Sequence, residues 1–187
     1  MANEFGDGLD KAVQKAFTRP APKTAGPQMR YLVKKLGGTR QTAQLLGMSQ
    51  RQVERYVAGA ARKPRIDLAT RLENEVKRRW QPQIRAQARK RAAQTTGIIV
   101  EVHARLGYTG APLETTDDAR VRHLTVALPP RYAGQLFHAQ QQGATEDQLR
   151  GLVGEALRDV YFQDNGQRAG SLSEVSLGDV LDLGFEL

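Results

Sequence analysis

The residues with the clearest capacity for chemistry lie on one short stretch. Arg51 and Arg55 can each donate two parallel hydrogen bonds to guanine in the major groove of DNA, and Gln50 and Gln52 can pair in a similar way with adenine. Ser49 followed three residues later by Gln52 is a capping box, which predicts that a helix begins here. These side chains then lie near the N-terminal end of that helix, where base contacts are usual. Gln52 cannot serve fully in both roles, because its capping hydrogen bond competes with base contact.

The residues around this helix fit a helix-turn-helix over residues 39–58. Ala43 occupies the position where the two helices must approach closely, and a larger side chain would push them apart. Gly47 occupies the turn, where a left-handed backbone costs glycine little. Val53 supplies the β-branched core residue of the second helix, which we call the recognition helix. The alternative is an ordinary pair of antiparallel helices with no role in binding.

The charge distribution favours a polyanionic partner. The chain has 187 residues and a formal net charge of +8. Residues 1–100 contain 21 Lys and Arg against 7 Asp and Glu, a net of +14, whereas residues 101–187 contain 7 against 13, a net of −6. A surface this basic attracts nucleic acid through Coulomb forces and counterion release. A solvated helical face is the alternative, but such faces usually alternate basic with acidic residues.

Further basic residues are expected to contact phosphate groups rather than bases. They are Arg62, Lys63 and Arg65 directly after the recognition helix, and two later runs, Lys77, Arg78 and Arg79, then Arg89, Lys90 and Arg91. Runs of this kind can follow the DNA backbone beyond the helix-turn-helix. Solubility alone is the alternative for the two later runs.

Several function classes are disfavoured by what the sequence lacks. It has no cysteine, which excludes disulfides, zinc fingers and thiol catalysis and is compatible with the cytoplasm. The three histidines, His103, His123 and His138, lack the spacing of metal ligands, and no glycine-rich phosphate loop is present. No apolar run approaches the roughly 18 residues of a membrane span, and the N-terminus is not typical of a secretory signal. We therefore expect a protein with no cofactor or metal of its own and no membrane association.

The whole pattern predicts an α+β fold in two domains. Residues 1–26 are expected to form a short amphipathic helix and a proline-rich linker, and residues 27–94 an all-helical domain that contains the helix-turn-helix and a basic helical extension. Residues 95–187 are expected to form a smaller mixed α+β domain. Its predicted elements are strands at 98–102 and 122–128, an exposed loop at 107–119, helices at 130–142 and 145–161, and an acidic tail from 171 that either adds strands or serves as an interaction tail.

Three stretches of the sequence resemble a known protein family in the order and spacing of their residues. They are KAFTRPAPKTAGPQMRYLVKKLG, AQLLGMSQRQVERYV and LPPRYAGQLFHAQQQGATEDQLRGLVGEALRDVYFQDNG. Read together, they resemble the terminal proteins of linear Streptomyces-type actinomycete chromosomes and plasmids, over roughly residues 11–168. The resemblance implies a telomere protein that becomes covalently attached to the 5′ end of DNA and primes the synthesis that patches the 3′ overhang.

The resemblance also implies partners and a location. A telomere-associated protein bound to the overhang recruits such proteins, and a DNA polymerase supplies the chemistry together with dNTP and Mg²⁺. Members of this group associate with one another. The protein would therefore act as a primer rather than as an autonomous enzyme, in the cytoplasm at the DNA ends of the nucleoid.

The resemblance places the DNA linkage at a threonine within a motif like Thr-Asp-Asp. Here the motif is Thr115-Thr116-Asp117-Asp118, in which Thr116 matches best and Thr115 is the alternative. A hydroxyl that primes synthesis must enter the active site of another protein, so an exposed loop such as 107–119 suits it. Metal ions of the polymerase would promote its attack on the α-phosphate. Competing hydroxyls belong to Tyr108 and Thr109 in the same loop and to Ser171, Ser173 and Ser176 in the tail.

A second function fits the same helix-turn-helix. A transcriptional regulator would bind a short palindrome through the recognition helix, and its C-terminal domain would dimerise or sense a ligand. It would carry no covalently attached nucleotide, which distinguishes it from a terminal protein.

Overall fold

The chain forms eight α-helices and a three-stranded antiparallel sheet within the residues that the structure describes. This computed structural model describes residues 4–109, 120–168, 170 and 172–187. The expected mixed α+β class is therefore confirmed. Two compact units divide the chain: Thr18–Pro82, which we call the helical unit, and Met1–Phe17 with Gln83–Leu187, which we call the sheet unit.

The helical unit packs four helices around one apolar core. The helices are α2 (Ala25–Leu36), α3 (Thr39–Leu46), α4 (Gln50–Val57) and α5 (Ile66–Arg79). The core is built from side chains at helical spacing on each of them, including Met29, Leu32, Leu46, Val53, Leu72 and Val76, all essentially inaccessible to solvent. Burial of these side chains fixes the four helices relative to one another.

A tight turn joins α3 to α4. Gly47 adopts the left-handed backbone with φ of 64°, and the N–H of Met48 donates to the carbonyl of Ala43 at 3.0 Å. Ser49 then begins α4: its hydroxyl accepts from the N–H of Gln52 at 3.3 Å, and the Gln52 amide oxygen accepts from the N–H of Ser49 at 3.2 Å. The predicted capping box is confirmed, and it satisfies two backbone donors at the start of a helix of only eight residues.

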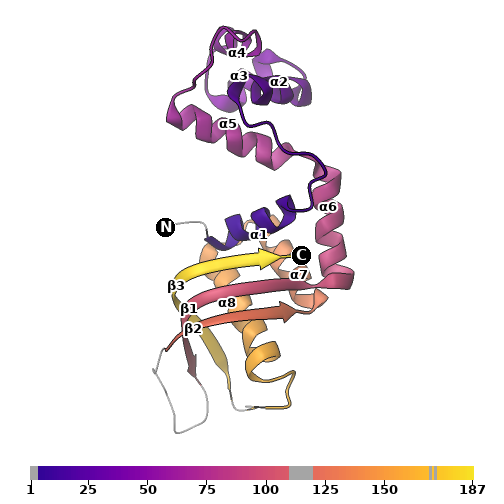
Figure 1. Cartoon of the computed structure of the whole chain (residues 1–187), viewed down its shortest axis with the longest axis vertical. Helices are drawn as coiled ribbons and strands as arrows, with labels where there is room; N and C mark the ends of the chain where they lie inside the picture. The colour runs from indigo at the N-terminus through magenta and orange to yellow at the C-terminus, as the bar shows by residue number, and fades with distance from the viewer. Residues whose placement is uncertain (1–3, 110–119, 169, 171) are drawn as a thin grey trace. The chain divides into compact units, whose positions relative to one another are not determined.

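The sheet unit is built on three antiparallel strands in the order β2-β1-β3 (Figure 1). They are β1 (Ile98–Thr109), β2 (Arg120–Leu128) and β3 (Glu174–Glu186). Pairing of β1 with β2 runs without interruption from Ile98 opposite Leu128 to Leu106 opposite Arg120, whereas pairing with β3 is irregular around Ala104. The acidic tail therefore adds a strand, one of the two outcomes expected for it.

Helices cover one face of this sheet. The helix α1 (Glu4–Gln14) contacts β3, α8 (Glu146–Leu157) contacts β2 and β3, and α7 (Pro130–Gln141) contacts β1 and β2. Figure 1 shows α7 and α8 behind the strands and α1 beside β3. Alternate strand residues such as Val100 and Val102 are buried against the helices, and those between them, such as Glu101, are exposed. Two π-helical turns, η1 (Ala92–Thr96) and η2 (Arg158–Phe162), end α6 (Pro82–Arg91) and α8.

The structure shifts two of the predicted boundaries. Residues 83–94, expected in the helix-turn-helix domain, lie in the sheet unit, as does α1. The reason is packing: Ala92 is fully buried in the same core as Leu9 of α1. Residues 107–109, expected in an exposed loop, instead belong to β1, where Thr109 pairs with Glu174 of β3. The rest of the loop expected at 107–119 lies outside the described residues.

No helix in the described part of the chain is both long enough and apolar enough to cross a lipid bilayer.

Candidate nucleic-acid interface

The outer face of α4 presents the side chains expected to read bases. Gln50, Arg51, Gln52 and Arg55 are all exposed, and Val53 on the opposite side is completely buried in the core. Arg51 and Arg55 are four residues apart and so lie above one another on one face of the helix. Neither makes an ion pair with any residue that the structure describes. Both guanidinium groups therefore keep their donors available for a ligand.

The two glutamines on this face are already engaged. The side-chain amide of Gln50 donates to the Glu54 carboxylate at 2.9 Å, and Gln52 holds the capping box. Each would have to exchange an existing hydrogen bond for a contact with a base. Arg51 and Arg55 are therefore the stronger candidates for direct readout, because they have no such bond to give up.

A residue of α2 helps to hold α4 in position, and the sequence alone did not indicate it. Arg30 of α2 donates from Nη1 to the carbonyl of Val57 at 3.2 Å. This bond satisfies one of the free carbonyls at the C-terminal end of α4. Only the tertiary contact between α2 and α4 reveals it, since the two residues are 27 positions apart.

The basic residues after α4 are also free of ion pairs. Arg62, Lys63 and Arg65 are exposed and form no salt bridge within the described residues. They lie between α4 and α5, outside either helix. Their charge is thus fully available to a polyanion.

The cations at the end of α5 are partly neutralised within the helix itself. Lys77 Nζ lies 2.7 Å from Glu73, Arg78 Nη1 lies 3.7 Å from Glu75, and Arg79 also pairs with Glu75. The Tyr31 hydroxyl donates to the Arg79 carbonyl, and burial raises the pKa of that tyrosine. Contact of this run with phosphate would have to compete with these pairs, so it is a weaker candidate than the sequence indicated.

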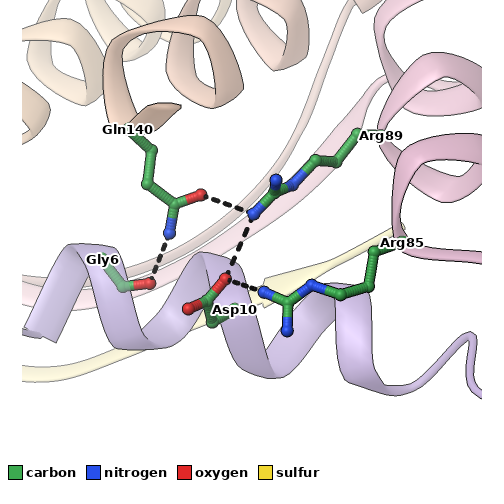
Figure 2. Close-up of polar contacts among 5 residues, drawn as sticks. All are labelled: Gly6, Asp10, Arg85, Arg89 and Gln140. Carbon is green, nitrogen blue, oxygen red and sulfur yellow. Dashed lines mark hydrogen bonds and ion pairs between the residues drawn. The ribbon is translucent and has the colours of Figure 1, made fainter. Parts of the chain in front are cut away.

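In the last basic run, Arg89 is held by contacts within the sheet unit, whereas Lys90 and Arg91 are exposed. Figure 2 shows Arg85 and Arg89 of α6 both reaching the carboxylate of Asp10 of α1, at 2.6 and 3.3 Å. Arg89 also donates to Gln140 of α7 at 3.3 Å, and the amide of Gln140 donates to the Gly6 carbonyl at 2.9 Å. The cluster thereby joins α1, α6 and α7.

Arg89 is therefore a weaker candidate for phosphate contact than the sequence indicated, because its guanidinium is engaged by Asp10 and Gln140. Its guanidinium lies over the Phe137 ring at 5.7 Å, and burial together with the charge of Arg85 lowers its pKa. Lys90 and Arg91, the other two members of the run, are exposed and stay candidates. Runs of basic residues look alike in sequence. Only the packing shows which arginine forms internal contacts and which is free to contact a ligand.

The hydroxyls considered for DNA linkage fall in different places. Thr115 and Thr116, with Asp117 and Asp118 beside them, lie outside the described residues, as does Ser171. Tyr108 and Thr109 belong to β1, and Ser176 is an exposed residue of β3. Ser173 directly precedes β3, and its carbonyl accepts a hydrogen bond from Arg158 at 2.8 Å.

The histidines do not assemble with carboxylates into a metal centre in the described residues, where no group of three or more such side chains could hold a metal ion. His103 and His123 face each other across β1 and β2, with ring centroids 5.7 Å apart, and His123 Nε2 lies 3.0 Å from Glu101. His138 is an exposed residue near the end of α7.

Comparison of the chain with models of protein families, with curated proteins and with solved structures gave no match. The geometry of α3, α4 and the segment after them therefore carries the functional argument.

Proposed function

We propose that this chain is a terminal protein that binds duplex DNA through a helix-turn-helix formed by α3 and α4 and primes DNA synthesis from a threonine hydroxyl. The observation that carries the DNA-binding part is the pair of exposed, unpaired arginines on α4, Arg51 and Arg55, on a helix held by the capping box at Ser49. The priming part rests on the resemblance of the sequence to terminal proteins.

The placement of acidic residues supports DNA binding by the helical unit. Residues 18–82 contain 15 Lys and Arg but only 4 Asp and Glu, a net of +11. Three of the four acids, Asp67, Glu73 and Glu75, pair with basic residues of α5 itself. The fourth acid, Glu54, lies on α4, where it accepts a hydrogen bond from Gln50 and forms no ion pair with Arg51 or Arg55 in the described residues. The cations on α4 and in the segment after it are therefore available for the counterion release that DNA binding requires.

The priming step has a definite chemistry. The oxygen of the Thr116 hydroxyl, or of Thr115, would attack the α-phosphorus of a dNTP, forming a phosphodiester bond while pyrophosphate leaves. The hydroxyl proton would pass to a base or water in the polymerase site. Mg²⁺ bound by the polymerase would stabilise both the attacking and the departing oxygens, so the threonine needs only to reach that site. A telomere-associated protein on the 3′ overhang would bring the chain to the DNA end.

The experiment combines the protein with a DNA polymerase, a labelled dNTP and a telomeric template. We expect labelled protein that survives boiling, with the label lost in Thr116→Val. Loss in Thr115→Val instead would move the acceptor by one residue. Thr125→Val, at an exposed threonine of β2, is the matched control and should keep the label. Label that persists in the double variant Thr115→Val/Thr116→Val would exclude this pair of residues as the acceptor.

A transcriptional regulator is the second candidate, favoured by the same exposed face of α4. The two functions differ in the covalent state of the protein. Chain isolated from its native host, treated with nuclease and weighed should exceed its sequence mass by a residual nucleotide if it is a terminal protein. A regulator would have the mass of the chain alone and would bind a short palindrome.

A further inference from the structure

The segment that follows α4 has an unusual combination of features. It runs from Ala58 to Arg65, with the sequence AGAARKPR, and we call it the basic connector. The N–H of Ala61 donates to the carbonyl of Arg55 at 3.2 Å, which fastens the start of the connector to the end of α4. Gly59 makes this reversal with a left-handed φ of 77°, a conformation that favours glycine.

In the second half of the basic connector, the three basic side chains are exposed to solvent. Residues 61–65 belong to no helix or strand. Arg65 has φ of −62° and ψ of 156°, and Pro64 has its own φ fixed by its ring. The ring of Pro64 therefore reduces the backbone entropy that this stretch loses if it becomes ordered on a ligand.

An exposed apolar residue directly follows these cations in the sequence. Ile66, at the start of α5, is 88% exposed, the highest value for any large hydrophobic residue in the described chain. It follows Arg65, and the three cations of the connector form no ion pair among the described residues. Phosphate binding would account for the exposed cations, but it would not account for an exposed isoleucine directly after them.

We propose that the basic connector enters the minor groove of DNA beside the major groove that α4 occupies, selecting A·T-rich sequence there. Arg62 and Arg65 would lie in the groove, and Ile66 would contact its floor or wall. The inference rests on the DNA binding proposed above and adds a second region of sequence selection to it. A·T-rich minor grooves are narrow and carry an enhanced negative potential that attracts inserted arginine. Proteins that bind the minor groove frequently insert an apolar side chain, isoleucine among them, between base steps.

The reach of the connector is adequate for this role. One sugar-phosphate strand separates a major groove from the next minor groove. Extended chain spans about 3.3–3.6 Å per residue, so the stretch from Ala61 to Arg65 can cross that strand and place an arginine in a groove about 6 Å wide. Arginine also gives up its hydration more readily than lysine, which favours Arg62 and Arg65 over Lys63 for the narrow groove.

The experiment first selects, from a random library, the DNA duplex that the full chain binds with the highest affinity, and then measures binding to it. Base pairs beside the α4 site are then changed from A·T to G·C or to inosine·C. Inosine·C resembles A·T in the minor groove, because it lacks the guanine amino group, but resembles G·C in the major groove. We expect G·C to weaken binding about tenfold and inosine·C to restore it to within about twofold.

Two sets of variants assign the effect to residues. Arg62→Gln/Arg65→Gln should remove the preference for A·T over G·C beside the site while preserving the preference at bases read by α4. Ile66→Ala should reduce the A·T preference more mildly, and alanine favours the helix at this position. The control is Lys11→Gln/Arg168→Gln, which removes two exposed cations of the sheet unit and should leave the preference intact. Circular dichroism verifies that each variant is folded.

Three results would overturn the inference. Equal binding to A·T and G·C beside the site would do so, as would inosine·C behaving like G·C. An equal loss of affinity for every duplex in Arg62→Gln/Arg65→Gln would show that the connector contacts phosphate only. Failure of the DNA binding proposed for α3 and α4 would give a different result. The wild-type chain would then bind no duplex selectively, or Arg51→Ala would leave base preference unaltered.

Discussion

The two units use the same residue type for opposite purposes. In the sheet unit, Arg85 is nine-tenths buried against Asp10, and Arg158 is held by Asp159 at 2.8 Å. In the helical unit, Arg51 and Arg55 are exposed and form no ion pair with the residues described. A count of basic residues therefore does not locate an interface. The placement of the acids decides which cations remain available.

The sheet unit contains a second polar cluster that follows the same rule. The Tyr132 hydroxyl donates to Asp159 at 2.5 Å, and Arg158 donates to the other oxygen of that carboxylate. Burial raises the pKa of Tyr132. Burial alone would raise the pKa of Asp159 too, but the hydrogen bonds from Tyr132 and Arg158 outweigh it, so the pKa of Asp159 is lowered. The cluster joins α7 to η2 within the sheet unit.

The largest effect should come from removing a buried arginine of the sheet unit. Arg85→Ala leaves Asp10 with only the longer contact to Arg89, and we expect the free energy of unfolding to fall by about 2–4 kcal/mol. Urea denaturation followed by circular dichroism measures the change. Affinity of the folded protein for DNA should stay within about twofold of the wild type. An unchanged unfolding midpoint would mean that Asp10 and Arg85 do not join α1 to α6.

Removing an exposed arginine of the helical unit should affect DNA binding without affecting stability. Arg51→Ala should reduce affinity for the preferred duplex about tenfold, since one bidentate base contact contributes about 1–3 kcal/mol. The variant should also change base preference, which a binding-site selection would reveal. Its unfolding midpoint should equal that of the wild type, because the side chain packs against nothing in the core. Preference identical to the wild type would contradict the assignment of α4 as the recognition helix.

A smaller effect is expected at the second polar cluster. Tyr132→Phe should lower the free energy of unfolding by about 1 kcal/mol at neutral pH, the usual contribution of such a hydrogen bond. Because the pKa of Asp159 is lowered in the folded state, its stabilisation is present above the ordinary carboxyl range and is lost as pH falls through the folded value. The difference between variant and wild type should therefore shrink in acid. A difference that grew in acid would contradict this assignment.

The smallest effect should come from the cations of α5. Lys77→Gln/Arg78→Gln removes charges already paired with Glu73 and Glu75. Exposed pairs of this kind contribute under about 1 kcal/mol, so stability should barely change and DNA affinity should fall by less than about threefold. The dependence of affinity on salt measures the number of phosphates contacted. A clearly flatter salt dependence would restore these residues as phosphate contacts, as the sequence predicted.

Local chemistry made much of the fold predictable. The capping box predicted at Ser49 is present, and a second one, formed by Thr145 and Gln148, begins α8. Each depends only on residues three positions apart. The burial of Ala43 and Val53 follows from spacing on a helix in the same way. Whether α3 and α4 bind DNA remains a prediction.

Long-range contacts set the features that the sequence could not show. The continuation of β1 through Gly107 depends on pairing with Ser176 of β3, far along the chain. The place of α6 in the sheet unit depends on Asp10 and Arg85, which are 75 positions apart. Arg89 resembles its neighbours in sequence, and the carboxylate that engages it lies on another helix.

The helical unit interrupts the sheet unit between α1 and α6, and this order has a consequence during synthesis. The helical unit is a compact unit formed by one continuous stretch, residues 18–82, so we expect it to fold once that stretch has left the ribosome. Phe5 and Leu9 of α1, by contrast, belong to a core that includes Phe185. Because α1 precedes the helical unit and Phe185 follows it, the apolar face of α1 stays exposed until the helical unit and the later part of the sheet unit have been translated. That face is a binding site for chaperones during this interval.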